Sequence, residues 1–155
     1  HPARVRRLVL VGAAALGIQP AEPVVLRPWT HLPPGPALEA VLRENLAVLM
    51  LAQPSSIDEF ALAMHVQNML RDRMRQRRLA RTDVLHRTLA HVRCPLHAIW
   101  GEQDVLVRGV QDRLAAGLSP APDLRSLVLV PHAGHWVQFE RADAFDRALA
   151  AALAQ

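Results

Sequence analysis

The chain has 155 residues, of which 51% are hydrophobic and 21% charged, and its formal net charge is +4. This length and composition suit one compact domain with a buried core, and they exclude a disordered or fibrous chain. The longest apolar runs are interrupted by Arg, Glu, Gln or Pro, so we expect no membrane span. The first residues show neither an initiator Met nor a signal-peptide pattern, so we expect a piece of a longer polypeptide.

The single cysteine, Cys94, stands before Pro95 at the entrance of an expected strand, and it cannot form an internal disulfide. We interpret it as a small buried hydrophobe rather than as a nucleophile or a metal ligand. Nothing in the cysteine usage contradicts a reducing compartment. We therefore expect a cytoplasmic protein.

The basic residues are all Arg, and the densest cluster runs from Arg71 to Arg78 and on to Arg81. The pattern favours a solvated helix face over a surface that binds an anionic substrate or partner. Nucleic-acid binding is disfavoured because the cluster holds no aromatic residue for base stacking and no recognisable binding motif.

The first predicted element is a strand over Val5 to Gly12, an apolar run typical of a parallel strand buried on both faces. Residues 13–36 are rich in Pro and Ala and predict an excursion away from the sheet. Apolar residues at helical spacing then predict a helix from Ala37 to Ala52, which Pro54 ends.

Two more helices are predicted before the next strand. The run Ser55 to Glu59 resembles an N-terminal capping segment, and a second helix covers roughly Ile57 to Leu79. A third, short helix covers about Thr82 to Ala90, with Thr82 or Asp83 as its cap. The expected core positions of the second helix are Phe60, Met64, Met69 and Met74.

The rest of the chain alternates strands and helices. A strand at Leu96 to Trp100 precedes a helix at about Val107 to Gly117, and a strand at Ser126 to Val130 precedes a helix at about Arg141 to Ala154. This alternation predicts a parallel sheet with right-handed crossovers. The helical block at 37–90 is an insertion, expected above the C-terminal strand ends, where open α/β sheets bind ligands.

An acid and a histidine follow successive strands at their C-terminal ends. Asp104 comes soon after Trp100, and His135 comes soon after Val130. A carboxylate in this place can accept a hydrogen bond from the Nδ1–H of the histidine, which then acts as general base and general acid. Glu102 is the competing acid, and a turn-forming or capping role is the alternative for Asp104.

The residues around His135 have expected roles of their own. Gly134 is expected to let the backbone make the tight turn that aims the ring. Trp136 either packs on a substrate or belongs to the core, and Glu140 suits the positive N-terminus of the last helix. His132 is expected to be structural or at a pocket rim. A metal site is disfavoured because the two histidines lack a third ligand at a recognisable spacing.

Three segments, at 1–12, 92–104 and 133–140, together resemble the C-terminal portion of an α/β-hydrolase fold protein. The resemblance implies an α/β fold class, namely the C-terminal part of an α/β-hydrolase parallel sheet, with three strands and flanking helices. The hydrolase core would comprise 1–12 and 91–155. A helical cap or lid would be inserted at 13–90.

The form Gly-His-Trp-Val-Gln-Phe-Glu at 134–140 is similar to that of hydrolases that cleave carbon–carbon bonds of vinylogous diketones from aromatic breakdown. Those enzymes have a Trp after the histidine, which points to Trp136, and a cap arginine that holds a substrate carboxylate, for which Arg71 and Arg73 are the candidates here. Esterases, lactonases and haloperoxidase-like members share the remaining features. The resemblance implies hydrolysis of a small-molecule ester or diketone, with no cofactor, no metal, and no nucleic-acid or membrane partner.

A nucleophile is missing from the expected triad, because none of the four serines lies in a Gly-x-Ser-x-Gly elbow. The α/β-hydrolase order of nucleophile, acid and histidine would place the elbow, and further upstream the oxyanion-hole loop, before His1. We therefore expect the chain alone to be inactive. We also expect it to be poorly soluble or oligomeric, a homo-oligomer included, because its first strand would have a bare edge. The alternative is a non-catalytic binding or interaction module that keeps a remnant of the fold. The serines are Ser55, Ser56, Ser119 and Ser126.

Overall fold

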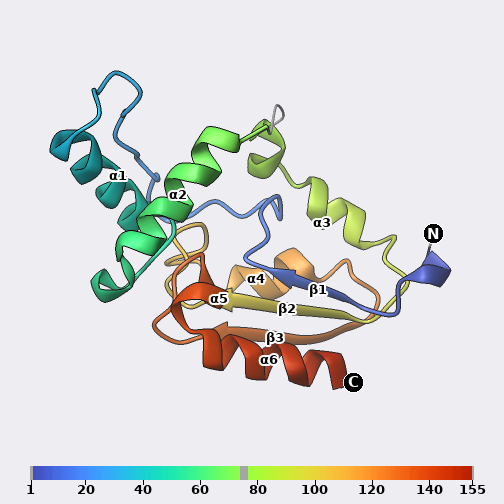
Figure 1. Ribbon diagram of the computed structural model, residues 1–155. Helices are drawn as coiled ribbons and strands as arrows, with labels where there is room; N and C mark the ends of the chain where they lie inside the picture. Colours follow the sequence, from blue (N-terminus) through green and yellow to red (C-terminus); the bar gives the residue numbers. More distant parts are fainter. Residues whose placement is uncertain (1, 74–76, 155) are drawn as a thin grey trace.

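The structure is a computed structural model that describes residues 2–73 and 77–154, and its centre is a parallel sheet of three strands (Figure 1). The strands are β1 (Leu8–Val11), β2 (Leu96–Gly101) and β3 (Leu124–Val130), in the order β1-β2-β3. Every residue of β2 is buried, as expected for a central strand covered on both faces, whereas β1 is half-buried throughout. The predicted parallel sheet with flanking helices is therefore confirmed.

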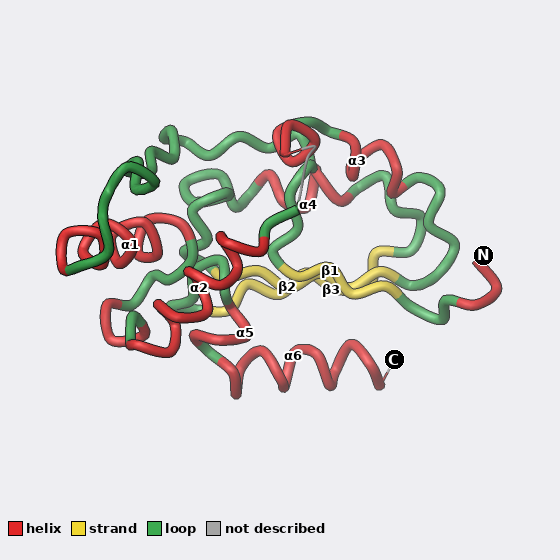
Figure 2. The backbone as a smooth tube through the Cα atoms, turned by 45° about the horizontal axis from the view of Figure 1, so that its top comes forward, coloured by secondary structure: helices red, strands yellow, loops and turns green. Residues whose placement is uncertain are grey.

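Helices cover the two faces of this sheet. The helices α3 (Val84–Leu89) and α4 (Arg113–Leu118) lie on one face, and α6 (Ala142–Ala154) lies on the other (Figure 2). Alternate side chains of β2 pack against the helices on the two faces, because successive residues of a strand point to opposite faces of the sheet. On the α3–α4 side these are Leu96, Ala98 and Trp100, and on the α6 side Ile99.

The helices α1 (Pro36–Leu49) and α2 (Glu59–Arg71) lie beyond the C-terminal ends of the strands, at the upper left in Figure 1. This is where the inserted helical block was expected. Pro36 occupies the first helical turn of α1, where its missing N–H costs nothing. Short 3-10 turns complete the regular structure, at Pro2–Arg4, Pro54–Ser56 and Arg77–Arg81.

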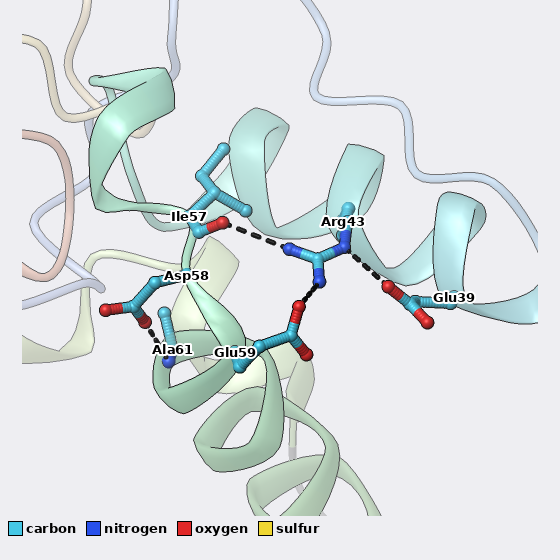
Figure 3. A network of polar contacts seen from close by, with 6 residues as sticks. All are labelled: Glu39, Arg43, Ile57, Asp58, Glu59 and Ala61. Atoms are coloured by element: carbon cyan, nitrogen blue, oxygen red, sulfur yellow. Dashed lines mark hydrogen bonds and ion pairs between the residues drawn. The ribbon is translucent and has the colours of Figure 1, made fainter. Parts of the chain in front are cut away.

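A polar network ties α1 to the start of α2 (Figure 3). Arg43 of α1 donates from Nε to Glu39 (2.9 Å), from a terminal nitrogen to the carbonyl of Ile57 (3.0 Å), and to the Glu59 carboxylate. The hydrogen bond to Glu39 is the largest cause of a raised pKa of Arg43. Asp58 caps α2 by accepting a hydrogen bond from Ala61 N at 2.7 Å, so the capping segment does begin a helix.

The second predicted helix is too long, because α2 ends at Arg71 and Asp72 is extended. In a longer helix, Arg73 and Arg77 would be four residues apart on one face, and their like charges would disfavour continuation of the helix. The core expectation for this helix was also wrong at Phe60, which is 63% exposed. The expected core position Met74 lies outside the described residues. The buried stripe of α2 is instead Ala61, Leu62 and His65.

The helix expected from Val107 is shorter than predicted, since regular α-helix begins at Arg113. Turns occupy the preceding residues, and Gly109 has a φ of 79° there, a left-handed conformation that ends any helix. In the described residues, no helix is long and apolar enough to cross a membrane.

Candidate active site

Asp104 lies in the turn that follows β2, and its side chain is completely buried. Its backbone N–H donates to the carbonyl of Gly101 (3.1 Å), and its own carbonyl accepts from Val107 N (3.0 Å). The carboxylate oxygen Oδ1 accepts from Leu106 N at 3.0 Å. These bonds fix the carboxylate in place and leave Oδ2 for a second partner.

That partner is His135, whose Nδ1 lies 2.9 Å from Oδ2 of Asp104. Since a carboxylate can only accept, Nδ1 carries the proton of this bond, and Nε2 is the nitrogen able to accept a proton. The His135 side chain is 24% exposed, so the ring is accessible while its carboxylate partner is not. The structure thus brings Asp104 and His135 together, and it leaves the competing acid Glu102 exposed.

The loop that carries His135 lies in close contact with the end of β2. A Cβ on Gly101 would lie 2.1 Å from the carbonyl oxygen of Gly134, so only glycine fits at this position. The expectation that Gly134 makes the tight turn was wrong, because the left-handed residue is His132 (φ 58°). Gly134 is needed for space instead, since a Cβ there would lie 2.8 Å from the carbonyl oxygen of Met50.

His135 lines a cavity of about 350 Å³ between its loop and the segment that joins α1 to α2. Gln103 and Arg108 also line it, and sequence reasoning singled out neither residue. Their place just after β2, in the same loop as Asp104, was the available signal, because residues that follow parallel strands meet at one edge of the sheet.

Trp136 is half-buried and packs with Phe139 against a cluster of α1 and α2 that includes Leu46. It also lines a second cavity of about 600 Å³, together with Met69 and His65. The rings of His65 and Trp136 meet edge to face, with centroids 6.2 Å apart. The indole therefore packs on a core cluster, one of the two expected situations, and it also lines a cavity, while its contact with a substrate stays a prediction.

The imidazole of His65 is buried, and burial lowers its pKa, so the cavity beside Trp136 is lined by a neutral ring at neutral pH. The two candidate arginines lie elsewhere. Arg71 and Arg73 are exposed, and among the described residues neither belongs to the lining of either cavity that contacts His135 or Trp136. The structure does not bring them to the site.

Glu140 was expected to act on the N-terminus of the last helix, and the structure corrects this. Glu140 ends the short helix α5 (Val137–Glu140), and its carboxylate accepts from three backbone N–H groups of other segments. The two oxygens of a carboxylate can accept all three of these hydrogen bonds. Helix α6 begins later, at Ala142, so Glu140 is not part of its first turn. The donors are Gly134, Ala52 and Gln53.

Two further observations concern chemistry at other positions. Ser126 lies within β3, and its hydroxyl is 2.9 Å from Nδ1 of the buried His97, so it is part of the sheet rather than an elbow.

No group of three or more His, Cys, Asp or Glu side chains that could hold a metal ion occurs in the parts of the chain that the structure describes.

No family model matches the chain. Solved structures do match it. One is a meta-cleavage product hydrolase from Pseudomonas fluorescens IP01, with 20% identity and a TM-score of 0.59 over 97% of this chain and 56% of that one. Another is a serine hydrolase from the polyaromatic hydrocarbon-degrading bacterium Cycloclasticus zankles, with 19% identity and a TM-score of 0.61 over 99% and 56%.

A third match is 2-hydroxy-6-oxo-6-phenylhexa-2,4-dienoate hydrolase from Rhodococcus sp. strain RHA1, with 19% identity and a TM-score of 0.58 over 99% of this chain and 57% of that one. The chain thus spans little more than half the length of each of these hydrolases. At this level of identity the likeness concerns the fold. Three parallel strands with their flanking helices therefore give this chain an α/β-hydrolase fold.

Proposed function

We propose that this chain supplies the acid and the base of a hydrolase triad, Asp104 and His135, to a nucleophile that lies upstream in a longer protein. One observation carries the proposal, the 2.9 Å contact between His135 Nδ1 and the completely buried carboxylate of Asp104. A buried carboxylate that fixes the tautomer of a partly exposed imidazole is the arrangement that proton transfer in a triad requires.

In the proposed reaction, His135 Nε2 takes the proton of the nucleophile as it attacks a carbonyl carbon. The imidazolium formed is stabilised by Asp104, which accepts the hydrogen bond from Nδ1–H throughout. His135 then returns the proton to the leaving group, and the same histidine activates the water that releases the product. The oxyanion that develops on the carbonyl needs donors that would come from the upstream part of the protein.

The helices between β1 and β2 would act as the cap of this site. Residues 13–90 contribute more than half of the residues that line each of the two cavities, the one at His135 and the one at Trp136. The cavity at Trp136 is also lined by Leu26, Leu49 and Met50, which suits the apolar or aromatic part of an ester or diketone, and by polar residues such as Asn45, which suit its carbonyl groups. Meta-cleavage product hydrolases among the similar structures favour the same class of substrate.

The proposal is tested by sequencing the gene upstream of the codon for His1 and expressing the extended protein. We expect a Gly-x-Ser-x-Gly elbow in that region and hydrolysis of p-nitrophenyl acetate or of a vinylogous diketone by the extended protein. His135→Ala should lower kcat by at least about 10⁴-fold. The exposed His91 provides the matched control, since His91→Ala should leave kcat unchanged.

Two outcomes would contradict the proposal. Ester turnover by the 155 residues alone, abolished by His135→Ala, would place the nucleophile within this chain. An extended protein that carries an elbow but hydrolyses neither substrate, while it binds small molecules, would favour the non-catalytic binding module instead.

A further inference from the structure

The loop that carries His135 is bonded on both sides of the histidine to the segment that joins α1 to α2. On one side, the carboxylate oxygen Oε2 of Glu140 accepts from Gly134 N at 2.6 Å and from Ala52 N at 3.1 Å. On the other side, Trp136 N donates to the carbonyl of Met50 at 2.9 Å. The residues before and after His135 are therefore both tied to one segment of the inserted helical block.

Glu140 accepts most of the hydrogen bonds that form this junction, by which we mean the contact between the His135 loop and the segment Met50 to Gln53. Its second oxygen, Oε1, accepts from Gln53 N at 2.5 Å, so one carboxylate satisfies three backbone donors from two segments that are 81 or more positions apart in sequence. Hydrogen bonds from N–H groups to an ionised carboxylate are shorter and stronger than neutral ones. Gly134 also leaves no space between the two segments, since a Cβ on it would lie 2.9 Å from Ala52 N.

The ring of His135 is confined from other directions by Asp104, which accepts its Nδ1–H, and by Gly12, whose Cβ position would lie 3.3 Å from the ring. The backbone carbonyl of His135 also lies near Gly12, 3.5 Å from the same Cβ position, and the residues on either side of His135 tie its backbone to the segment Met50 to Gln53. A shift of about 1 Å in the backbone would lengthen the 2.9 Å contact with Asp104 beyond a hydrogen bond.

We infer that Glu140 is a positioning residue for His135, and that through Glu140 the segment Met50 to Gln53 sets the distance between His135 and Asp104. The inference rests on the proposed function, because positioning matters only if His135 transfers protons. Glu140 itself touches no reacting atom. Since Met50 and Trp136 also line the larger cavity, a ligand bound there would contact both sides of the same junction.

The test compares Glu140→Gln with wild type in this 155-residue chain. Amide hydrogen exchange reports on the peptides around Ala52, Gln53 and Gly134, and the NMR signal of the His135 Nδ1–H proton reports on its bond to Asp104. We expect exchange of the three amides to accelerate at least tenfold, and the Nδ1–H signal to broaden or move upfield. Glu140→Asp, which keeps the charge on a shorter side chain, should give a smaller change of the same sign.

Two controls separate positioning from general stability. Asp58→Ala removes the cap of α2 without touching the junction, and Asp123→Asn removes a carboxylate that pairs with Arg125 on the surface. Neither should alter the Nδ1–H signal. An unchanged signal in Glu140→Gln with faster amide exchange, or an equal change in Asp58→Ala, would overturn the inference.

A wild-type chain whose Nδ1–H signal is absent, or survives Asp104→Ala, would instead overturn the proposed function itself, because the acid and the histidine would not be paired. In the extended enzyme the same Glu140 variants should lower kcat about tenfold or more with little change in KM. A change in KM alone would assign Glu140 to the shape of the substrate cavity and overturn its positioning role.

Discussion

Gly12 lies against the imidazole ring of His135: a Cβ on Gly12 would be 3.3 Å from both Nδ1 and Cε1 of that ring. Gly12 follows β1 and donates its N–H to the carbonyl of Ile99 at 3.0 Å, so its position is fixed by the sheet. The residue after β1, the acid after β2 and the histidine after β3 therefore meet at one edge of the sheet. Any side chain at Gly12 acts directly on the proposed base.

Gly12→Ala should displace the ring of His135 from Asp104. The new Cβ is tighter against the ring than ordinary contacts allow, and φ at Gly12 is +52°, which costs an alanine about 1 kcal/mol. We expect a lower Tm and a weakened His135 Nδ1–H signal in NMR spectra. Gly17→Ala is the matched control, because Gly17 has a φ of +73° and its Cβ would meet Asp83 instead. Gly17→Ala should lower Tm by a similar amount but leave the His135 Nδ1–H signal unaltered. The same His135 signal in both variants would refute the displacement of the ring by Gly12→Ala.

Gly101→Ala should be far more destabilising than an ordinary glycine replacement. The added Cβ would lie 2.1 Å from the Gly134 carbonyl oxygen and 2.3 Å from that of Ala133, and both are backbone atoms that cannot rotate away. We expect a loss of about 3 kcal/mol or more in the free energy of unfolding, measured by urea denaturation. The Cβ of Gly117→Ala would lie 3.0 Å from the flexible end of Ile18 and 3.3 Å from Leu16 Cβ, with no backbone atom as close, so this variant should lose clearly less stability, about 1 kcal/mol. Comparable losses in the two variants would show that the His135 loop can move away from β2.

The strands and the histidine loop were predictable because their signals are local. A mostly apolar run such as Leu96 to Trp100, with His97 as its one polar residue, predicts a strand of the sheet, and β2 indeed covers Leu96–Gly101 with every residue buried. The chain order of Asp104 and His135, each after a strand, was enough to expect that they meet, and their side chains do. Their catalytic role remains a prediction.

Other features could not be predicted because they depend on segments distant in sequence. Glu140 has the spacing of a helix-start acid, but its partners are Ala52 and Gln53, which no local pattern connects to it. Phe60 fits a helical apolar stripe, yet it is exposed and stacks on Phe139 of α5. In both cases tertiary contacts decided where a side chain lies, which helical periodicity alone does not describe.

Acid should destabilise the fold through its buried histidines. Burial lowers the pKa of His65 and of His97, and Arg7 and Arg125 lower that of His97 further. The unfolded chain then binds protons more readily than the folded one, so stability falls as the pH drops below about 6.5, the ordinary pKa of histidine. We expect a lower urea midpoint at pH 5.5 than at pH 7.5.

Replacing both rings should reduce this dependence on pH. The double variant His65→Gln, His97→Gln removes both titrating groups, so the difference between its midpoints at the two pH values should shrink. His91→Gln, at an exposed position, should keep the wild-type difference. An undiminished difference in the double variant would mean that other groups cause the acid sensitivity.

The free edge of β1 should make the chain associate with itself. Leu8 N donates to Pro95 and Gly12 N to Ile99, so in a parallel pair the N–H groups of the alternate residues, Val9 among them, point away from β2. In the part of the chain that the structure describes, no strand pairs with that edge. Unpaired edges of apolar strands are templates for pairing between chains.

Val9→Pro should weaken that association, because proline removes an outward N–H and is tolerated on an edge strand. Sedimentation velocity over a range of concentrations should show oligomers for the wild-type chain and a shift toward monomer for Val9→Pro. Val25→Pro, at an exposed position in the loop before α1, should sediment as wild type does. The extended protein should be less associated than the 155 residues, since its upstream part would cover the edge in our proposal. A wild-type chain that is a monodisperse monomer at all concentrations would contradict the open edge of β1 and would count against the proposal that this chain is part of a longer protein.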